Sequence, residues 1–144
     1  MDFEFINERF CSLRDQIAIK KGDPRFFELS LRPECEGAPH IEIDGDQLHF
    51  VICERGVEYK RQTTSDLDTL LYWLIAFMTP YVAEERLRQE KNSSWNEREV
   101  WFREEESILG KLNPEWAERK RIEHDWLLYP EKRDELPWPL DFFD

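Results

Sequence analysis

The chain has 144 residues and a formal net charge of −12, with 40% hydrophobic, 14% aromatic and 36% charged residues. The hydrophobic and aromatic content excludes wholesale disorder, and the length predicts one domain over residues 1–144. An acidic chain is repelled by phosphate backbones and attracts basic partners. The charge therefore disfavours direct nucleic-acid binding and favours a basic protein partner. The alternative is that the acidity serves solubility alone.

The cysteines and the N-terminus indicate a cytoplasmic protein. Cys11, Cys35 and Cys53 are widely spaced, and no C-x-x-C pair or cysteine/histidine cluster with zinc spacing is present. The N-terminal sequence M-D-F-E-F-I lacks the basic start of a signal peptide, and the most apolar stretch falls short of the roughly 20 residues that span a membrane. We therefore expect a reducing compartment and no membrane segment.

Residues 1–39 predict a helix, a strand and a loop in turn. The helix has an apolar stripe and ends near Lys20-Lys21-Gly22, because cations and a left-handed residue favour a helix C-terminus; the stripe is Ile6, Phe10, Leu13 and Ile17. Arg25–Leu31 alternates apolar and polar residues, which predicts a strand. Pro33–Pro39 contains a glycine between prolines and predicts a loop.

From His40 to Thr63 the apolar residues recur with period two, which predicts a meander of three antiparallel strands. The turns fall at Asp44-Gly45-Asp46 and Glu54-Arg55-Gly56. We expect one face to be polar and the other to pack on a helix. The expected inward residues are Leu48, Phe50, Ile52, Val57 and Tyr59. Arg25–Leu31 is the candidate fourth strand.

Thr63–Pro80 predicts the central core helix, because its leucines, Ile75 and Met78 recur at helical spacing with aromatic residues on the other sides. Ser65 and Asp68 resemble a capping box at its start. Pro80 lacks a backbone N–H, so we expect it to end or kink this helix. A further charged helical stretch follows and breaks near Asn92-Ser93.

Two more helices follow the charged stretch. Ser94 and Glu97 resemble a capping box for a helix that runs to Leu109 and closes at Gly110. Asn113 followed by Pro114 predicts an N-cap and first residue of a helix to about Tyr129. The proline-rich tail, residues 130–144, either docks on the body or stays loose. The predicted class is α+β, with a small antiparallel sheet of three to four strands packed against about four helices.

No constellation in the sequence favours catalysis, so we expect neither enzyme activity nor a cofactor or metal. The chain has no glycine-rich phosphate loop, no G-x-S-x-G and no H-E-x-x-H. His40 and His49 approach if the hairpin pairs about Gly45, with Glu42 or Asp46 as a third ligand. The alternative is a solvated, polar sheet face. Arg55 with Arg61 beyond it is a candidate anion clamp. The alternative is that Arg55 caps a turn and pairs with Glu54 or Glu58.

Three motifs carry a family resemblance: Glu54-Arg55-Gly56-x-Glu58, Leu70-Leu71-Tyr72-Trp73 and Leu112-Asn113-Pro114-Glu115-Trp116. Together with their surroundings from His40 to Asp125, they resemble the immunity proteins of bacterial polymorphic toxin systems, specifically the family numbered sixty-three. The tail from Trp138 to Asp144 and the stretch before Glu36 show no such likeness. The resemblance implies a non-catalytic protein that binds and neutralises a cognate toxin.

The resemblance and the charge together suggest where such a partner binds. Many of these toxins are nucleases with basic clefts, to which acidic side chains are complementary. Acidic residues and possible aromatic anchors cluster after Pro80, and the candidates are Glu84, Glu85, Trp95, Glu97, Trp101, Glu104 and Glu105. Two other functions stay open: an intracellular adaptor or regulator that binds another basic protein, and a small hydrolase or metal enzyme built around His40 and His49.

Overall fold

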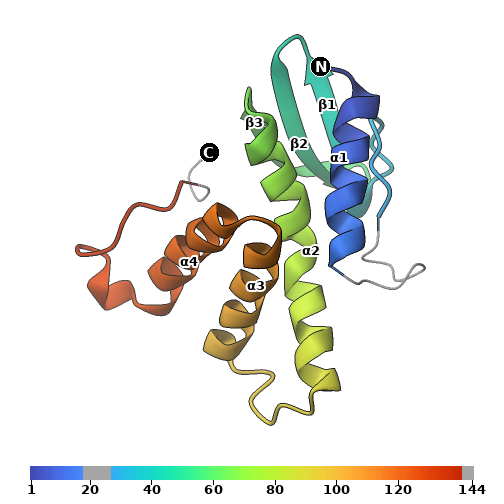
Figure 1. Ribbon diagram of the computed structural model, residues 1–144. Helices are drawn as coiled ribbons and strands as arrows, with labels where there is room; N and C mark the ends of the chain where they lie inside the picture. The colour runs from blue at the N-terminus through green and yellow to red at the C-terminus, as the bar shows by residue number, and fades with distance from the viewer. Residues whose placement is uncertain (18–26, 141–144) are drawn as a thin grey trace. The chain divides into compact units, whose positions relative to one another are not determined.

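The computed structural model describes residues 1–17 and 27–140, which form an α+β fold with a three-stranded antiparallel sheet and four helices (Figure 1). This confirms the predicted class. Two compact units, Met1–Met78 and Thr79–Asp144, divide the chain within helix α2. The elements in order are α1 (Phe3–Gln16), β1 (Glu36–Asp44), β2 (Gln47–Glu54), β3 (Val57–Thr64), α2 (Leu67–Gln89), α3 (Arg98–Leu112), α4 (Pro114–Leu128) and the short 3-10 helix η1 (Pro130–Lys132).

Helix α1 begins at Asp2, whose side chain accepts a hydrogen bond from the backbone N–H of Phe5. The predicted apolar stripe is largely confirmed, because Ile6, Phe10 and Ile17 are buried. Arg14 is buried beside the stripe, and its Nη1 donates to the carbonyl of Phe27 at 3.0 Å. The helix ends at Gln16, and the predicted C-terminal residues 20–22 lie outside the described residues.

The predicted strand Arg25–Leu31 is wrong for the part that the structure describes, since residues 27–31 form no strand. Phe27 and Leu29 are buried as the alternation suggests, and the carbonyl of Ser30 accepts one bond from Ile41 N at 2.9 Å. The Ser30 hydroxyl accepts from the backbone N–H of Arg32 at 3.0 Å. This local turn competes with a sheet ladder and ends the extended stretch. Residues 25 and 26 lie outside the described residues.

The three-stranded meander is confirmed, with the order β1-β2-β3 and both pairs antiparallel. At the first turn Gly45 has φ 60°, and at the second Arg55 and Gly56 have φ 52° and 79°. These are the left-handed conformations that a tight hairpin turn requires, which explains the predicted turn signals. Strand β1 starts at Glu36, inside the predicted loop.

Val57 and Tyr59 do not point inward as predicted: they are 52% and 66% exposed. The register between β2 and β3 is irregular, because Ile52 pairs with Lys60 whereas Cys53 pairs with Glu58. The extra residue of this bulge breaks the two-residue alternation from which the inward direction was predicted. Leu48 and Phe50 are buried, as expected, and Phe50 packs 6.3 Å from the Trp73 ring of α2.

The other sheet face is less polar than predicted. His40 and Val51 lie opposite one another there and are both buried. Cys53 on the same face forms a disulfide with Cys35, so the expectation of unpaired cysteines is wrong for this pair. The strand register brings their Cα atoms within 4.4 Å, and Cys11 remains free. The spacing of the cysteines in the sequence does not predict that Cys35 and Cys53 lie close together.

Helix α2 starts at Leu67, and its cap is Asp66 rather than Ser65: Asp66 Oδ2 accepts from Thr69 N at 3.2 Å. Its first half is a core helix, as predicted, with Leu70, Leu74 and Ile75 fully buried. The predicted end at Pro80 is wrong, since the helix continues to Gln89. None of the helices in the described ranges is long and apolar enough to cross a membrane.

In the second unit, the Asn113–Pro114 helix start is confirmed, because Asn113 Oδ1 accepts from Glu115 N at 3.0 Å. Gly110 does not close α3 but lies within it. A Cβ at Gly110 would lie 3.2 Å from the Cβ of Ala117 on α4, so glycine permits a close approach of the two helices. The α3 cap is Glu97, not Ser94.

The described part of the tail contacts α4 of this unit. The ring of Trp138 lies 5.1 Å from that of Trp126 on α4 in an edge-on arrangement. Pro139 is buried, while Trp138 and Leu140 are exposed. Residues 141–144 lie outside the described ranges, and docking of the whole tail, residues 130–144, stays a prediction.

Replacing Cys35 by Ser is expected to lower the free energy of unfolding by about 3 kcal/mol. The disulfide closes a loop between residues 18 apart, and losing it returns that conformational freedom to the unfolded chain. Urea denaturation with and without dithiothreitol measures the difference. Cys11→Ser is the control, and equal midpoints for oxidised and reduced wild-type protein would show that the disulfide contributes no stability.

Candidate partner-binding surface

Three of the predicted candidates, two acids and one aromatic residue, lie near the end of α2, and Arg88 contacts two of them. Arg88 Nη2 lies 2.9 Å from Glu84 Oε1, and its guanidinium carbon lies 4.0 Å from the centre of the Trp95 ring. Glu85 accepts from Gln89 Nε2 at 3.2 Å. Glu84, Glu85 and Trp95 are each partly exposed. The structure therefore brings this group together as an accessible, mixed-charge surface.

Glu97 and Glu104 extend the surface along α3. Glu97 is exposed at the helix N-terminus, where the helix dipole favours a carboxylate. Glu104 is partly exposed two turns further on. We name the partly or fully exposed carboxylates Glu84, Glu85, Glu97 and Glu104 the acidic surface.

Two predicted candidates have structural roles instead. Trp101 is half-buried, and its indole Nε1 donates to the carbonyl of Pro80 at 2.6 Å. This bond fixes α3 against the end of α2, so the indole N–H is already in use. Glu105 is only 4% exposed, and the expectation that it lies on the solvated face of its helix is wrong. Acidic and basic residues are interleaved along α3, and this pattern does not predict that one of the acids points inward.

Glu105 belongs to a buried ionic cluster between α3 and α4 that the sequence did not reveal. His124 Nδ1 lies 2.7 Å from Glu106 Oε2, and His124 Nε2 lies 3.7 Å from Glu105 Oε2. The imidazole also stacks on Phe102 with a ring separation of 3.8 Å. The hydroxyl of Thr79 donates to Glu105 Oε1 at 3.5 Å.

Basic side chains at the rim of the cluster neutralise its remaining acids. Arg103 bridges Glu106 at 2.8 Å and Asp125 at 2.7 Å. Arg121 Nη1 lies 2.7 Å from the second carboxylate oxygen of Asp125. Buried charges need such partners, because removing one member leaves the other uncompensated. The cluster therefore holds α3 and α4 in one arrangement.

The burial of this cluster shifts two pKa values. Desolvation raises the pKa of Glu105 to about 7, against opposing effects of nearby Lys120 and of the Thr79 hydroxyl. Desolvation also lowers the pKa of His124, although the hydrogen bond to Glu106 opposes this shift. His124 is therefore neutral at pH 7, and we assign its Nδ1 proton to the bond with the Glu106 carboxylate.

A second charged network lies on the sheet. Arg61 on β3 contacts Glu42 on β1 at 3.0 Å and Glu58 at 2.7 Å. Glu42 also accepts from His40 Nε2 at 2.9 Å. The hydrogen bond from Arg61 and, to a smaller extent, the hydrogen bond from His40 lower the pKa of Glu42 to about 2. Arg61 is therefore paired internally with two glutamates, whereas the alternatives for Arg55 stay predictions.

The two sheet histidines do not form a site together. The register places His49 opposite Glu42 and His40 opposite Val51. His49 Nδ1 bonds with the Thr63 hydroxyl at 2.8 Å, whereas His40 bonds with Glu42. Within residues 1–17 and 27–140, no group of three histidine, cysteine or carboxylate side chains is arranged to hold a metal.

The motif residues divide between surface and interior. Glu54, Arg55, Gly56 and Glu58 are exposed at the turn from β2 to β3. The aromatic motif residues Tyr72, Trp73 and Trp116 are buried in the core. Asn113 and Pro114 form the start of α4. Of the motifs, the hairpin turn is the one whose named residues are all exposed.

Comparison with known proteins gives one match. The family model described as Immunity protein 63 matches residues 44–126, which run from the end of β1 through almost all of α4. No curated protein and no solved structure matches the chain.

Glu105→Gln is expected to stabilise the protein increasingly as the pH rises from 5 to 8. The pKa of Glu105 is about 7 in the folded state against 4.5 for a freely solvated glutamate, so the folded state binds an extra proton between these pH values. The stability that this protonation contributes is complete below pH 4.5 and is lost as the pH rises through 7. The gain from glutamine should approach about 3 kcal/mol at pH 8.

Urea denaturation at intervals of half a pH unit measures this difference. Glu104→Gln is the matched control, because it removes a carboxylate at the next, partly exposed position of the same helix. Parallel stability curves for wild type and Glu105→Gln would contradict a raised pKa at this position.

Proposed function

Because the chain belongs to the Immunity protein 63 family, we propose that it binds a cognate bacterial toxin and blocks the action of that toxin. The observation that carries this proposal is the match over residues 44–126, more than half of the 144-residue chain. The matched part includes β2, β3, α2 and α3 in full. The proposal concerns a role in binding rather than a reaction.

The charged groups in unusual environments support a non-catalytic role. Glu42 is engaged by Arg61 and His40, and Glu106 by His124 and Arg103. A catalytic acid or base must reach a substrate with its titrating atom. In this chain these atoms are instead occupied by internal ion pairs, which suits a protein that acts through its surface.

The net charge supports a basic partner. At −12 the chain attracts a cationic protein over long range and accelerates the encounter. We propose that the toxin is a nuclease whose basic cleft meets the acidic surface, Glu84, Glu85, Glu97 and Glu104, with Trp95 as an aromatic anchor. The carboxylates would then occupy positions that substrate phosphates otherwise take.

The compartment is a separate proposal. The sequence led us to propose the cytoplasm because the cysteines were expected to be unpaired. The Cys35–Cys53 disulfide weighs against this location, since reducing cytosol opens such bonds and the periplasm maintains them. Blocking free thiols in intact cells and then measuring the mass of the protein distinguishes the two: one blocked cysteine indicates an oxidising compartment, and three indicate the cytoplasm.

Wild-type protein is expected to form a complex with the toxin domain encoded beside its gene and to abolish toxin activity. Replacing Glu85 and Glu104 by Lys should lower the association rate constant about tenfold at low salt, because local attraction becomes repulsion. The variant should also show a weaker salt dependence. Surface plasmon resonance at several ionic strengths measures both quantities.

The control is Glu8→Lys with Glu131→Lys, which changes the net charge equally at two exposed positions outside the acidic surface. Equal rates for the two double variants would place the interface elsewhere. A wild-type protein that neither binds nor inhibits the toxin would refute the proposed function. Capture of a different basic protein from lysate would then favour the adaptor alternative.

A further inference from the structure

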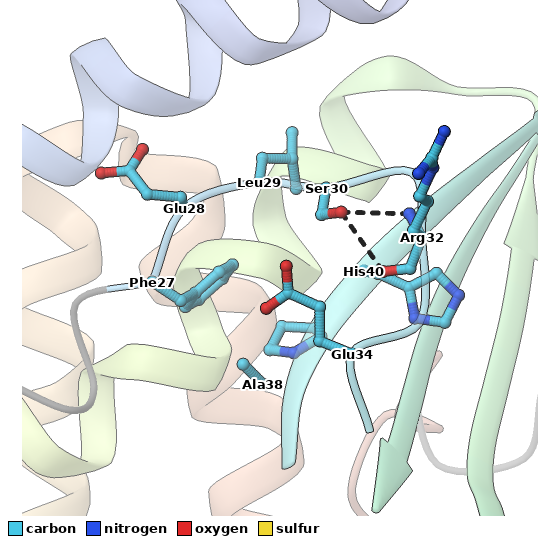
Figure 2. A pocket seen from close by; sticks show the side chains of 9 residues that line it. Phe27, Glu28, Leu29, Ser30, Arg32, Glu34, Ala38 and His40 are labelled. Atoms are coloured by element: carbon cyan, nitrogen blue, oxygen red, sulfur yellow. Dashed lines mark hydrogen bonds between the residues drawn. The ribbon is translucent and has the colours of Figure 1, made fainter. Parts of the chain in front are cut away.

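A cavity of about 490 Å³ lies in the first unit, between residues 27–34 and the start of β1 (Figure 2). Its apolar walls include Phe27, Leu29 and Pro39, and its polar lining includes Glu34 and His40. The volume falls in the range of sites that hold a small ligand or a single large side chain, and the mixture of apolar walls with few polar groups is typical of such sites.

Three interactions fix the walls of the cavity. The buried guanidinium of Arg14 donates to the carbonyl of Phe27 at 3.0 Å and lies 3.2 Å from Glu28 Oε2. The carbonyl of Ser30 accepts from the backbone N–H of Ile41 at 2.9 Å. The disulfide from Cys35 to β2 holds the other end of the segment. A binding group on such a fixed segment loses little entropy when it engages a ligand.

His40 supplies a hydrogen-bond acceptor among the residues that line the cavity. Its residue is 3% exposed, and among the described residues Glu42 is the hydrogen-bond partner of its ring. Glu42 is ionised and therefore only accepts, so we assign the ring proton to Nε2. Nδ1 then carries a lone pair and remains available to a donor from outside.

The carboxylate of Glu34 adds a negative charge to the same space. Figure 2 shows this carboxylate directed toward the region between Phe27 and Ser30, whereas the guanidinium of Arg32 extends away from it. The other carboxylate of the lining, Glu28, is already paired with Arg14. The cavity thus presents acceptors on apolar walls and one carboxylate without an ion pair among the described residues.

We propose that this cavity receives one basic side chain, lysine or arginine, that projects from the toxin; the inference rests on the proposed function. A basic side chain combines an apolar stem with a cationic donor head, which matches the apolar walls, His40 Nδ1 and Glu34. An anionic group would face Glu34, and an apolar group would displace water from the His40 acceptor without supplying a donor.

The location gives this contact a role in choosing between toxins. All residues that line the cavity precede position 44, whereas the family match begins there. The cavity is therefore a feature of this chain in addition to the matched region. A pocket that requires a lysine or arginine at one point of the partner penalises a toxin that lacks it, because the Glu34 carboxylate and the His40 acceptor then lose water without gaining a donor.

The test uses the toxin and a matched pair of small probes. Glu34→Lys should raise the dissociation constant for the toxin at least tenfold, mainly through faster dissociation, while Glu8→Lys should leave it within twofold. In a double-mutant cycle, Glu34→Gln should be coupled to replacement of one toxin lysine or arginine by methionine and to no other. Lysine amide should shift the backbone NMR signals of residues 27–40 at millimolar concentration, and norleucine amide, which lacks the side-chain charge, should not.

The outcomes separate this inference from the proposed function. If wild-type protein binds the toxin and Glu34→Lys binds equally well, the cavity is not part of the interface and the inference is wrong while the proposed function stands. Equal responses to lysine amide and norleucine amide would also overturn it, because the pocket would then not recognise charge. If wild-type protein forms no toxin complex, the proposed function is wrong, and the inference that rests on it is wrong with it.

Discussion

The pairing register of the sheet is the constraint on which the first unit depends. It places Arg61 within reach of Glu42, and it brings Cys53 beside Cys35. A slip of one residue would turn every side chain of a strand to the opposite face, which would break the Glu42–Arg61 pair and the disulfide together. The contact between His40 and Glu42 lies within β1 and assigns the proton of the neutral imidazole to Nε2. The strand register therefore determines both the disulfide and the charged pair on this face of the sheet.

The second unit depends on a cluster of buried charged side chains. Glu105, Glu106 and Asp125 are acids that contribute to the net charge in the sequence, yet they lie inside and are matched by Arg103, Arg121 and His124. A net charge of −12 is therefore no measure of the acids available to a partner. The carboxylates that reach solvent at the end of α2 and along α3 form a smaller set, and electrostatic steering depends on these.

The family match and the cavity lie in different parts of the chain, which suggests that the two parts have different roles. Residues 44–126 supply two strands, the core helix and the helical pair. Residues 27–40 precede this part and depend on Arg14, Ile41 and the disulfide for their position. Phe27 and Leu29 of this segment belong to the core, whereas the exposed position Glu34 can vary without disturbing it. Such a segment is a suitable place for partner selection.

The sequence alone determined the features that depend on near neighbours. Gly45 and the Arg55-Gly56 pair specify hairpin turns through left-handed backbone, Asn113-Pro114 specifies a helix start, and the leucines of α2 specify a buried helix, so the α+β class followed. The motif resemblance likewise lay in local strings. Only the tertiary structure decided the bulge that exposes Tyr59, the Cys35–Cys53 pairing, the burial of Glu105 and the cavity beside His40. Each of these depends on segments far apart in the chain meeting in one register, and local periodicity contains no information about that meeting.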